Sequence, residues 1–268
     1  MKTEHLSKLL NWFEGKNSVL VALSGGVDSA LVAYSAYTKF GKSAIAVTAD
    51  YKTLAQEELE YAKKISSEIG IKHIVIEYNE LANESFVKND NNRCFYCRSE
   101  LSEHLLQVAK EFETDMIVDG TNIDDLGDYR PGVSALRQNG IRSPLAETRF
   151  SKKMVRETAK NVGLSVYDKP SNSCLASRIP WGQSVTAERL ARIEIGEKIV
   201  KQLTGAKQVR VRDMDGTAKI EVGVDELPLL ENNTVLQKIK NQLKLISFED
   251  VSIDPEGYRP GKINVITS

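Results

Sequence analysis

The sequence predicts an α/β fold with a doubly wound, mainly parallel sheet, followed by a smaller C-terminal α+β domain. Short apolar strand candidates alternate with helical patterns through the first 170 residues, and the pattern then changes. Strands that alternate with helices are typical of a parallel sheet covered by helices on both faces. Such sheets bind their ligands at the carboxyl ends of the strands.

Four apolar runs in this first part are the candidate strands. They are Val19–Leu23, Ser43–Thr48, His73–Ile76 and Met116–Asp119. Between the second and third runs, apolar residues recur at helical spacing, at Leu59, Ala62, Ile65 and Ile69. A further helix is expected over Lys152–Val162, ending near Gly163.

The composition changes around Lys169-Pro170-Ser171-Asn172. Because the position before a proline disfavours helical backbone, this segment is expected to be a linker. We place a domain boundary here, which gives domains of residues 1–170 and 171–268.

Helices and strands in the second domain do not alternate regularly. The expected elements are Thr186–Leu203 (helix), Gln208–Arg212 and Ala218–Val222 (strands), Val235–Leu245 (helix) and Ser247–Ile253 (strand). Ser184 or Thr186 is the expected cap of the first helix. The turn Met214-Asp215-Gly216 joins the first two strands and predicts a hairpin.

A glycine-rich loop, Ser24-Gly25-Gly26-Val27-Asp28-Ser29, directly follows the first strand candidate and precedes a helix. In that arrangement the backbone N–H groups and the positive helix end form a nest for phosphate oxygens. The two glycines allow close approach of the backbone, and the two serines add hydroxyl donors. A Walker A loop is longer and has a lysine before its Ser/Thr. The absence of a lysine within this loop argues against simple transfer of a terminal phosphate.

This loop resembles the pyrophosphate loop (PP-loop) of the N-type ATP pyrophosphatases, which transfer AMP to a substrate oxygen and release pyrophosphate. The resemblance implies an adenine nucleotide alpha hydrolase-like fold and ATP as a cosubstrate. It assigns ATP contacts to Ser24, Gly25, Gly26, Val27, Asp28 and Ser29. Asp28 would act in catalysis by placing Mg²⁺ against the phosphates.

Composition narrows the class of protein. Hydrophobic residues make up 41% and charged residues 27%, which is ordinary for a globular protein. The net charge of −1 gives no general attraction for nucleic acid, so nucleic acid is not expected as the main partner. The N-terminal residues lack a signal-peptide pattern, and no apolar run approaches the ~18 residues of a membrane span. These features predict a cytoplasmic protein without a membrane partner.

The chain has three cysteines, Cys94, Cys97 and Cys174. A Cys-x-x-Cys pair lies between a polar loop and a helix predicted over Ser99–Phe112, and it suits zinc, an iron–sulfur cluster or a redox disulfide. Three thiolates together can hold a 4Fe–4S cluster and leave one iron open to an external sulfide. The alternative is three unrelated thiols.

Two further groups of polar residues are candidates for a binding site. Asp119-Gly120-Thr121 follows the fourth strand candidate, so it is expected at the same sheet edge as the glycine-rich loop; an acidic turn is the alternative. Arg210 and Arg212 alternate along a strand and share a face, which suits a phosphate or carboxylate or else an exposed face. His5, His73 and His104 are scattered and are interpreted as structural or exposed.

Taken together, these residues resemble the ATP-dependent sulfur insertases of nickel-pincer nucleotide biosynthesis, the LarE type. The resemblance covers nearly the whole chain. It includes the glycine-rich loop, Asp128–Gly132 (Asp-Tyr-Arg-Pro-Gly), Cys174 with Ser177-Arg178, Val209–Arg212 and the terminal turn Gly257–Gly261.

The resemblance implies that pyridinium-3,5-biscarboxylic acid mononucleotide is the substrate and that its carboxylates become thiocarboxylates. ATP adenylates a carboxylate, and a sulfur nucleophile then displaces AMP. By the same resemblance the product is a precursor of the nickel-pincer cofactor of lactate racemase, and the enzyme is a homo-oligomer. Residues that would line the substrate site are Ser177, Arg178, Glu197, Arg210, Arg212 and Glu221.

In the single-cysteine form of this family the enzyme gives up the sulfur of its own cysteine. The present chain departs from that form because it also carries Cys94 and Cys97. It resembles the three-cysteine subgroup, which favours a 4Fe–4S cluster on Cys94, Cys97 and Cys174 that carries sulfide from an external donor. Two alternatives remain, a tRNA-thiolating PP-loop enzyme and a zinc-stabilised nucleotide-binding regulator.

Overall fold

A computed structural model describes residues 2–126 and 131–259. The chain forms two compact units, and neither is a single continuous segment. Unit 1 comprises Met1–Asn79 and Asn92–Asn172, and unit 2 comprises Glu80–Asn91 and Ser173–Ser268. The short segment Glu80–Asn91 thus leaves unit 1 and returns to it.

Unit 1 is built on a parallel sheet of four strands in the order β3-β2-β1-β4. The strands are β1 (Val19–Ala22), β2 (Ala44–Asp50), β3 (Lys72–Glu77) and β4 (Ile117–Val118). The helices are α1 (Lys2–Trp12), α2 (Val27–Phe40), α3 (Gln56–Ile69), α5 (Arg93–Glu111), α6 (Pro131–Gln138), α7 (Pro144–Glu147) and α8 (Lys152–Asn161). Two 3₁₀ turns, η1 (Gly41–Ser43) and η3 (Ile123–Leu126), complete this unit. This arrangement confirms the predicted α/β fold.

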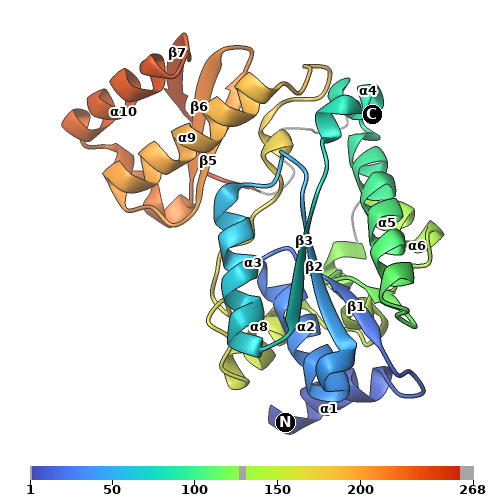
Figure 1. Ribbon diagram of the computed structural model, residues 1–268. Helices are drawn as coiled ribbons and strands as arrows, with labels where there is room; N and C mark the ends of the chain where they lie inside the picture. Colours follow the sequence, from blue (N-terminus) through green and yellow to red (C-terminus); the bar gives the residue numbers. More distant parts are fainter. Residues whose placement is uncertain (1, 127–130, 260–268) are drawn as a thin grey trace. The chain divides into compact units, whose positions relative to one another are not determined.

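The sheet is wound in both directions from its centre. From β1 the chain moves outward through α2 to β2 and through α3 to β3, and then α5 carries it back past β1 to β4. Right-handed crossovers therefore put α2 and α3 on one face and α5 on the other, as Figure 1 shows. The winding reverses between β1 and β4, so their carboxyl ends border the crevice where such folds bind ligands.

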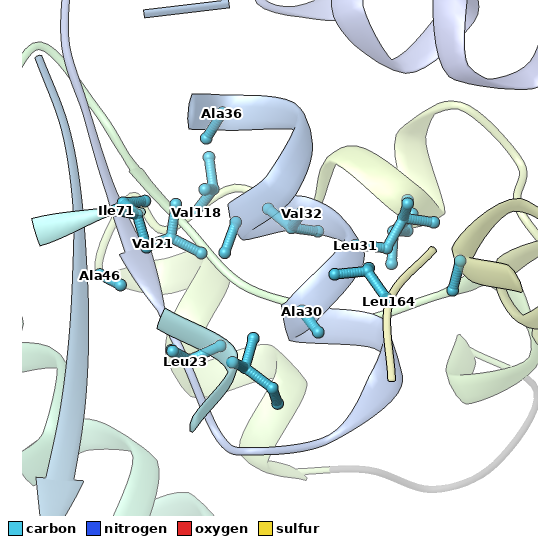
Figure 2. Close-up of a cluster of buried hydrophobic side chains, with 14 of the residues drawn as sticks. Val21, Leu23, Ala30, Leu31, Val32, Ala36, Ala46, Ile71, Val118 and Leu164 are labelled. Carbon is cyan, nitrogen blue, oxygen red and sulfur yellow. The ribbon is translucent and has the colours of Figure 1, made fainter. Parts of the chain in front are cut away.

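The core of unit 1 lies between the sheet and the helices α1, α2 and α8. Figure 2 shows Val21 of β1 and Ala46 of β2 on one side of α2, and Leu31 of α2 near Leu164 on the other side. β1 and β2 are buried along nearly their whole length, as expected for strands covered on both faces. This packing fixes the start of α2 and the loop before it.

Unit 2 has a three-stranded sheet in the order β5-β6-β7, in which β5 and β6 are antiparallel and β6 and β7 parallel. Its strands are β5 (Val209–Met214), β6 (Thr217–Val222) and β7 (Asp250–Ile253). Its helices are α4 (Glu84–Val87), α9 (Ala187–Thr204) and α10 (Asn233–Leu245), with 3₁₀ turns η2 (Glu80–Ala82), η4 (Leu175–Arg178) and η5 (Val224–Leu230). α9 packs on β5, and α10 packs on α9 and β7.

Local signals explain several of these boundaries. The Thr186 side chain caps α9 by accepting a hydrogen bond from the Arg189 N–H at 3.3 Å. Asp215 and Gly216 both have positive φ and close the hairpin between β5 and β6.

Three predicted boundaries were wrong. The helix that carries Cys94 and Cys97 begins at Arg93 rather than Ser99, because the polar residues before the cysteine pair end where its first turn begins. β4 is only two residues long, and β7 begins at Asp250 rather than Ser247, whose φ is 71°. No helix in the described part of the chain is long and apolar enough to cross a membrane.

Candidate functional site

The glycine-rich loop turns sharply between the end of β1 and the start of α2. Gly25 has a φ of 77°, and a side chain there would collide with the backbone oxygen of Glu58. Ser29 braces the turn, since its Oγ accepts from the Ser24 N–H at 3.1 Å and lies 3.0 Å from the Ser24 Oγ. The loop is therefore a compact, pre-formed turn at the N-terminus of a 14-residue helix.

Asp28 lies in the first turn of α2 and is held by two side chains from distant parts of unit 1. Asn122 Nδ2 donates to Asp28 Oδ1 at 3.0 Å. The ammonium of Lys152 pairs with Asp28 Oδ2. Both oxygens of the carboxylate are thus engaged at the edge of the loop.

The segment Asp119-Gly120-Thr121 follows β4 and lies against the start of α2. A Cβ on Gly120 would come within 2.6 Å of the Ser29 nitrogen, so only glycine fits between the two backbones. Thr121 donates from its hydroxyl to Asp119 Oδ2 at 2.5 Å and from its N–H to Oδ1 at 3.2 Å. Burial raises the pKa of Asp119 above its ordinary value, although these hydrogen bonds and one from Ser143 oppose the shift.

Sequence reasoning missed two lysines near the loop, because it looked for a lysine only within the loop itself. Lys152 at the start of α8 pairs with Asp28, and Lys169 donates to the Gly25 carbonyl at 3.0 Å. Lys169 also pairs with Glu58 of α3 at 2.5 Å. The fold supplies these cations from positions that no spacing rule links to the loop.

The second group of candidate residues gathers within unit 2 as a buried charge cluster, which we define as Arg178, Glu197, Arg210, Arg212 and Glu221. Every member is at least 94% buried. Arg178 pairs with Glu197 through two hydrogen bonds, from Nε to Oε1 at 2.8 Å and from Nη2 to Oε2 at 3.1 Å. The cluster holds three arginines and two glutamates, so it carries one surplus positive charge when all five are ionised.

Ser177 and the backbone before it connect the two ends of this cluster. Arg178 Nη1 donates to the carbonyl oxygens of Ser173 and Cys174 and to the Ser177 hydroxyl, at 2.7, 3.0 and 3.0 Å. Arg212 Nη1 donates to the Ser177 carbonyl at 2.9 Å. All six residues expected to line a substrate site therefore lie together in unit 2, and Cys174 is attached to them through its backbone.

Arg210 and Arg212 are buried side chains and are not an exposed strand face. Arg212 pairs with Glu221 across the hairpin at 2.7 Å. The ring of Tyr258 lies 5.0 Å from the Arg210 guanidinium and 6.0 Å from that of Arg212. The sequence analysis named the terminal turn that contains Tyr258 but gave no sign that its ring contacts this cluster.

The charges of the cluster shift one another's pKa values. Burial alone would lower the pKa of Arg178, but Glu197, with smaller effects of Cys174 and Tyr258, holds it above its ordinary value. Burial alone would raise the pKa of Glu197, and Arg178 holds it below its ordinary value instead. Burial, together with the nearby Arg178 charge, lowers the pKa of Arg210 to about 10.

Known proteins similar to this chain cover nearly its full length. An uncharacterised protein of Synechocystis is 40% identical over 264 residues, which are 98% of each chain. The pyridinium-3,5-bisthiocarboxylic acid mononucleotide synthase of Lactiplantibacillus plantarum is 30% identical over 249 residues, which are 92% of this chain and 88% of the synthase. The present chain belongs to this synthase family. It is accordingly an ATP-using group transferase of the PP-loop type.

More distant similarities lie within the same fold. Residues 18–100 match the family described as "Queuosine biosynthesis protein QueC". The tRNA-specific 2-thiouridylase MnmA of Rickettsia africae is 23% identical in an alignment of 201 positions that covers 61% of this chain and 55% of that enzyme. The synthase family therefore accounts for much more of the chain than the thiouridylase does.

The three cysteines lie in different units. Cys94 and Cys97 are within the first five residues of α5 in unit 1, and Cys174 precedes η4 in unit 2. Within residues 2–126 and 131–259, no group of three His, Cys, Asp or Glu side chains is arranged to hold a metal ion. The structure thus does not support the expected 4Fe–4S cluster.

Two motifs of the resemblance fall partly outside the described residues. Asp128, Tyr129 and Arg130 of the first turn lie outside them, as do Pro260 and Gly261 of the second. The histidines have structural contacts, as expected. His73 Nε2 hydrogen-bonds to Thr48 Oγ1 at 2.8 Å, and His104 stacks on Tyr78 with ring centroids 4.2 Å apart.

Proposed function

We propose that this chain is an ATP-dependent sulfur transferase acting on pyridinium-3,5-biscarboxylic acid mononucleotide. It adenylates the carboxylates and replaces oxygen with sulfur, giving the bisthiocarboxylic acid mononucleotide that is a precursor of the nickel-pincer cofactor of lactate racemase. The observation that carries the proposal is the buried charge cluster attached to Cys174, in a chain of the synthase family. The phosphate and the two carboxylates of the substrate are anionic, so the surplus positive charge of the cluster would attract them.

The nucleotide half of the reaction is proposed for the loop of unit 1. Ser24, Gly25, Gly26, Val27, Asp28 and Ser29 would contact the phosphates, with Asp119, Gly120 and Thr121 beside them. A substrate carboxylate oxygen attacks the α-phosphorus of ATP, and the bond to the pyrophosphate oxygen breaks. An aspartate carboxylate at a phosphate nest is a suitable Mg²⁺ ligand, so Asp28 would hold the ion, which neutralises phosphate charge when bound.

The products of ATP test this half. We expect AMP and pyrophosphate, with no ADP, when the biscarboxylate substrate is present. Replacing Asp28 with Ala should nearly abolish that step, because a metal or phosphate contact in such a site contributes several kcal/mol to the transition state. Stoichiometric ADP would refute the assignment.

The substrate half is proposed for the charge cluster, with Ser177, Arg178, Glu197, Arg210, Arg212 and Glu221 lining the site. Arg210→Ala and Arg212→Ala should each weaken use of the pyridinium nucleotide and leave ATP binding largely unchanged. The corresponding Lys variants should restore activity only in part, because lysine lacks the planar, two-pronged guanidinium. Wild-type kinetics in both Ala variants would assign these arginines a purely structural role.

For sulfur delivery we propose a 4Fe–4S cluster on Cys94, Cys97 and Cys174, loaded by an external sulfide donor. Two of the thiols fit that role by their local chemistry. Cys94 and Cys97 are three residues apart at the positive end of a helix, and the Arg93 guanidinium lies 4.0 Å from the Cys94 sulfur. Such a cluster would supply an open iron for sulfide.

Two variants separate this route from sacrifice of the Cys174 sulfur. With a shared cluster, Cys94→Ala should lose iron and activity as fully as Cys174→Ala, and the wild-type mass should be unchanged after repeated turnover. If Cys174 were sacrificed, each chain would act once and lose the mass of H₂S, and Cys94→Ala would keep its single-turnover activity. Anaerobic purification with iron and sulfide assays gives the first answer.

tRNA thiolation is the alternative function, and the partial similarity to a 2-thiouridylase is the observation that favours it. It predicts sulfur incorporation into tRNA and no reaction with the pyridinium nucleotide. A cytoplasmic location and a homo-oligomeric state also belong to the proposal. Light scattering of the purified protein tests the second of these.

A further inference from the structure

Glu58 lies in the first turn of α3 and binds the segment that leads out of unit 1. Its side chain is 7% exposed, and its two carboxylate oxygens contact different residues of that segment. Oε2 pairs with the Lys169 ammonium at 2.5 Å, and Oε1 accepts from Asn172 Nδ2 at 2.9 Å. Asn172 is the last residue of unit 1, and Cys174 follows it by two positions. Glu58 thus fixes the point at which the chain leaves unit 1 toward Cys174.

The same ammonium connects Glu58 to the glycine-rich loop, because Lys169 also donates to the Gly25 carbonyl at 3.0 Å. In a planar trans peptide, the carbonyl of one residue and the N–H of the next point in opposite directions. The contact therefore keeps the Gly26 N–H facing away from Lys169, and this N–H is one of the donors proposed for the phosphates. The Tyr61 ring lies 4.1 Å from the ammonium and restricts its motion.

Arg156 of α8 anchors the backbone of this segment separately. Its guanidinium donates to the carbonyl oxygens of Tyr167 and Lys169 at 2.9 and 2.7 Å. The segment therefore keeps an attachment to unit 1 when Glu58 is changed. What Glu58 alone controls is the direction of the Lys169 ammonium and the position of Asn172, so its substitution perturbs the loop and the exit from unit 1 together.

We propose that Glu58 is a positioning residue for both half-reactions. Through Lys169 it orients the glycine-rich loop, and through Asn172 it fixes the start of the segment that carries Cys174. This inference rests on the proposed function, in which the loop serves adenylation and Cys174 belongs to the site that delivers sulfur. Water competes with sulfur for the acyl adenylate: it attacks the carbonyl carbon, the bond to the phosphate oxygen breaks, and AMP leaves with the electron pair. The carboxylate is regenerated, and the protons of the water go to solvent.

The substitution Glu58→Gln should uncouple the two half-reactions. Glutamine keeps the shape of the side chain but removes its charge and turns an amide N–H toward Lys169 or Asn172. With ATP, Mg²⁺, sulfide and the pyridinium nucleotide, the variant should form about tenfold more AMP per thiocarboxylate than the wild type, because misplaced groups react slowly. A role in stability alone would lower both products in proportion. Glu60→Gln, which removes an exposed carboxylate paired with Lys63 on the same helix, should keep the wild-type ratio.

Amide hydrogen exchange of the full-length protein without substrate tests the positioning itself. In Glu58→Gln, peptides from residues 24–27 and 169–174 should exchange about tenfold faster than in the wild type, as expected for loss of a charge-assisted hydrogen bond. Exchange in β2 and β5 should not change, whereas a general loss of stability would accelerate it there too. Asn172→Ala removes only the contact near Cys174, so it should accelerate exchange in residues 169–174 alone and also raise the ratio of AMP to thiocarboxylate.

A wild-type ratio of products in Glu58→Gln, or unchanged exchange in the loop and the segment after it, would overturn the inference. Should Glu58→Gln fail to fold, Asn172→Ala decides: a raised product ratio would support the inference, and a wild-type ratio would overturn it. Failure of the proposed function would appear separately, as wild-type enzyme that forms no AMP with the biscarboxylate nucleotide. The exchange measurements would then still show whether Glu58 positions the loop and the exit from unit 1.

Discussion

The Arg178–Glu197 ion pair gives a sharp test of the charge cluster, through the substitution Glu197→Gln. Glutamine has the same shape and can keep its carbonyl oxygen toward Arg178 Nε and the Val211 N–H, which lie 2.8 and 3.2 Å from Glu197 Oε1. Its amide group would then face Arg178 Nη2, donor against donor, in place of the 3.1 Å hydrogen bond. The buried guanidinium would also lose its counter-charge.

Breaking a buried ion pair by removing one partner costs about 3–5 kcal/mol. Because glutamine keeps one acceptor, we expect a loss near the lower end, about 3 kcal/mol. For a cooperative unit of about a hundred residues, that loss lowers the melting temperature by roughly 10–20 °C. Lys198→Met, which breaks the exposed pair with Glu194 on the same helix, should cost less than about 1 kcal/mol.

Chemical denaturation at several pH values measures both the size and the sign of this effect. Arg178 depresses the pKa of Glu197 in the folded protein, so the pair stabilises the fold above the unfolded pKa of glutamate, about 4.3. The stabilisation is lost as the pH falls through the depressed folded value. At pH 7 the free energy of unfolding of the wild type should therefore exceed that of Glu197→Gln by the full amount. This difference should shrink below about pH 4. A Gln variant no less stable than Lys198→Met at pH 7 would refute this reasoning.

Three further substitutions test the packing and the charges around the proposed sites. Gly120→Ala should lower the free energy of unfolding by about 2 kcal/mol in urea titration, because its Cβ would strike the Ser29 backbone. The control is Gly26→Ala, which should fold normally because a Cβ there meets only a serine hydroxyl at 3.6 Å. Equal stability of the two variants would contradict this prediction. Burial raises the pKa of Asp119 in the folded protein, so its contribution to stability is fully present below the unfolded pKa and is lost as the pH rises. Asp119→Asn should therefore be at least as stable as the wild type at pH 7.5 and should lose that advantage in acid. A clear loss of stability in this variant at pH 7.5 would contradict the prediction. Asn89→Ala should lower the free energy of unfolding by about 2 kcal/mol in thermal melts, since the buried amide of Asn89 donates to the Pro180 and Gln183 carbonyls at 2.8 and 2.7 Å. A near-neutral effect would show that water replaces the amide.

The fold of unit 1 was predictable because its signals are local. Strand β1 is a continuous apolar run, and the glycine-rich loop after it identifies both the strand end and the start of α2. The carboxyl ends of parallel strands meet at one edge of a sheet. Asp119 and Gly120 follow a strand candidate, so they were expected at the same edge as the loop, and Gly120 lies against Ser29 there.

Contacts between distant parts of the chain could not be predicted in this way. Nothing in the spacing of Lys152 or Lys169 distinguishes them from the other lysines of surface helices and linkers, and only the fold brings them to Asp28 and Gly25. The burial of Arg210 and Arg212 was equally hidden, because alternation along a strand identifies a shared face but not whether that face is covered. Tyr258 covers it from the terminal turn.

The charge cluster of unit 2 is difficult to explain as a device for stability. Buried ion pairs contribute little to stability compared with apolar residues of the same size, and this small unit buries three arginines, two from β5 and one from η4. The pKa of Arg210 is lowered to about 10, first by burial and second by the Arg178 charge, so repulsion between the arginines contributes only part of this shift. An anion bound at the cluster would relieve that repulsion, so its binding energy would include strain that the empty site already contains. Anion binding and proton binding at Arg210 are then thermodynamically linked. An anion bound there must raise the pKa of Arg210, and loss of the Arg210 proton must weaken the affinity for the anion to the same degree.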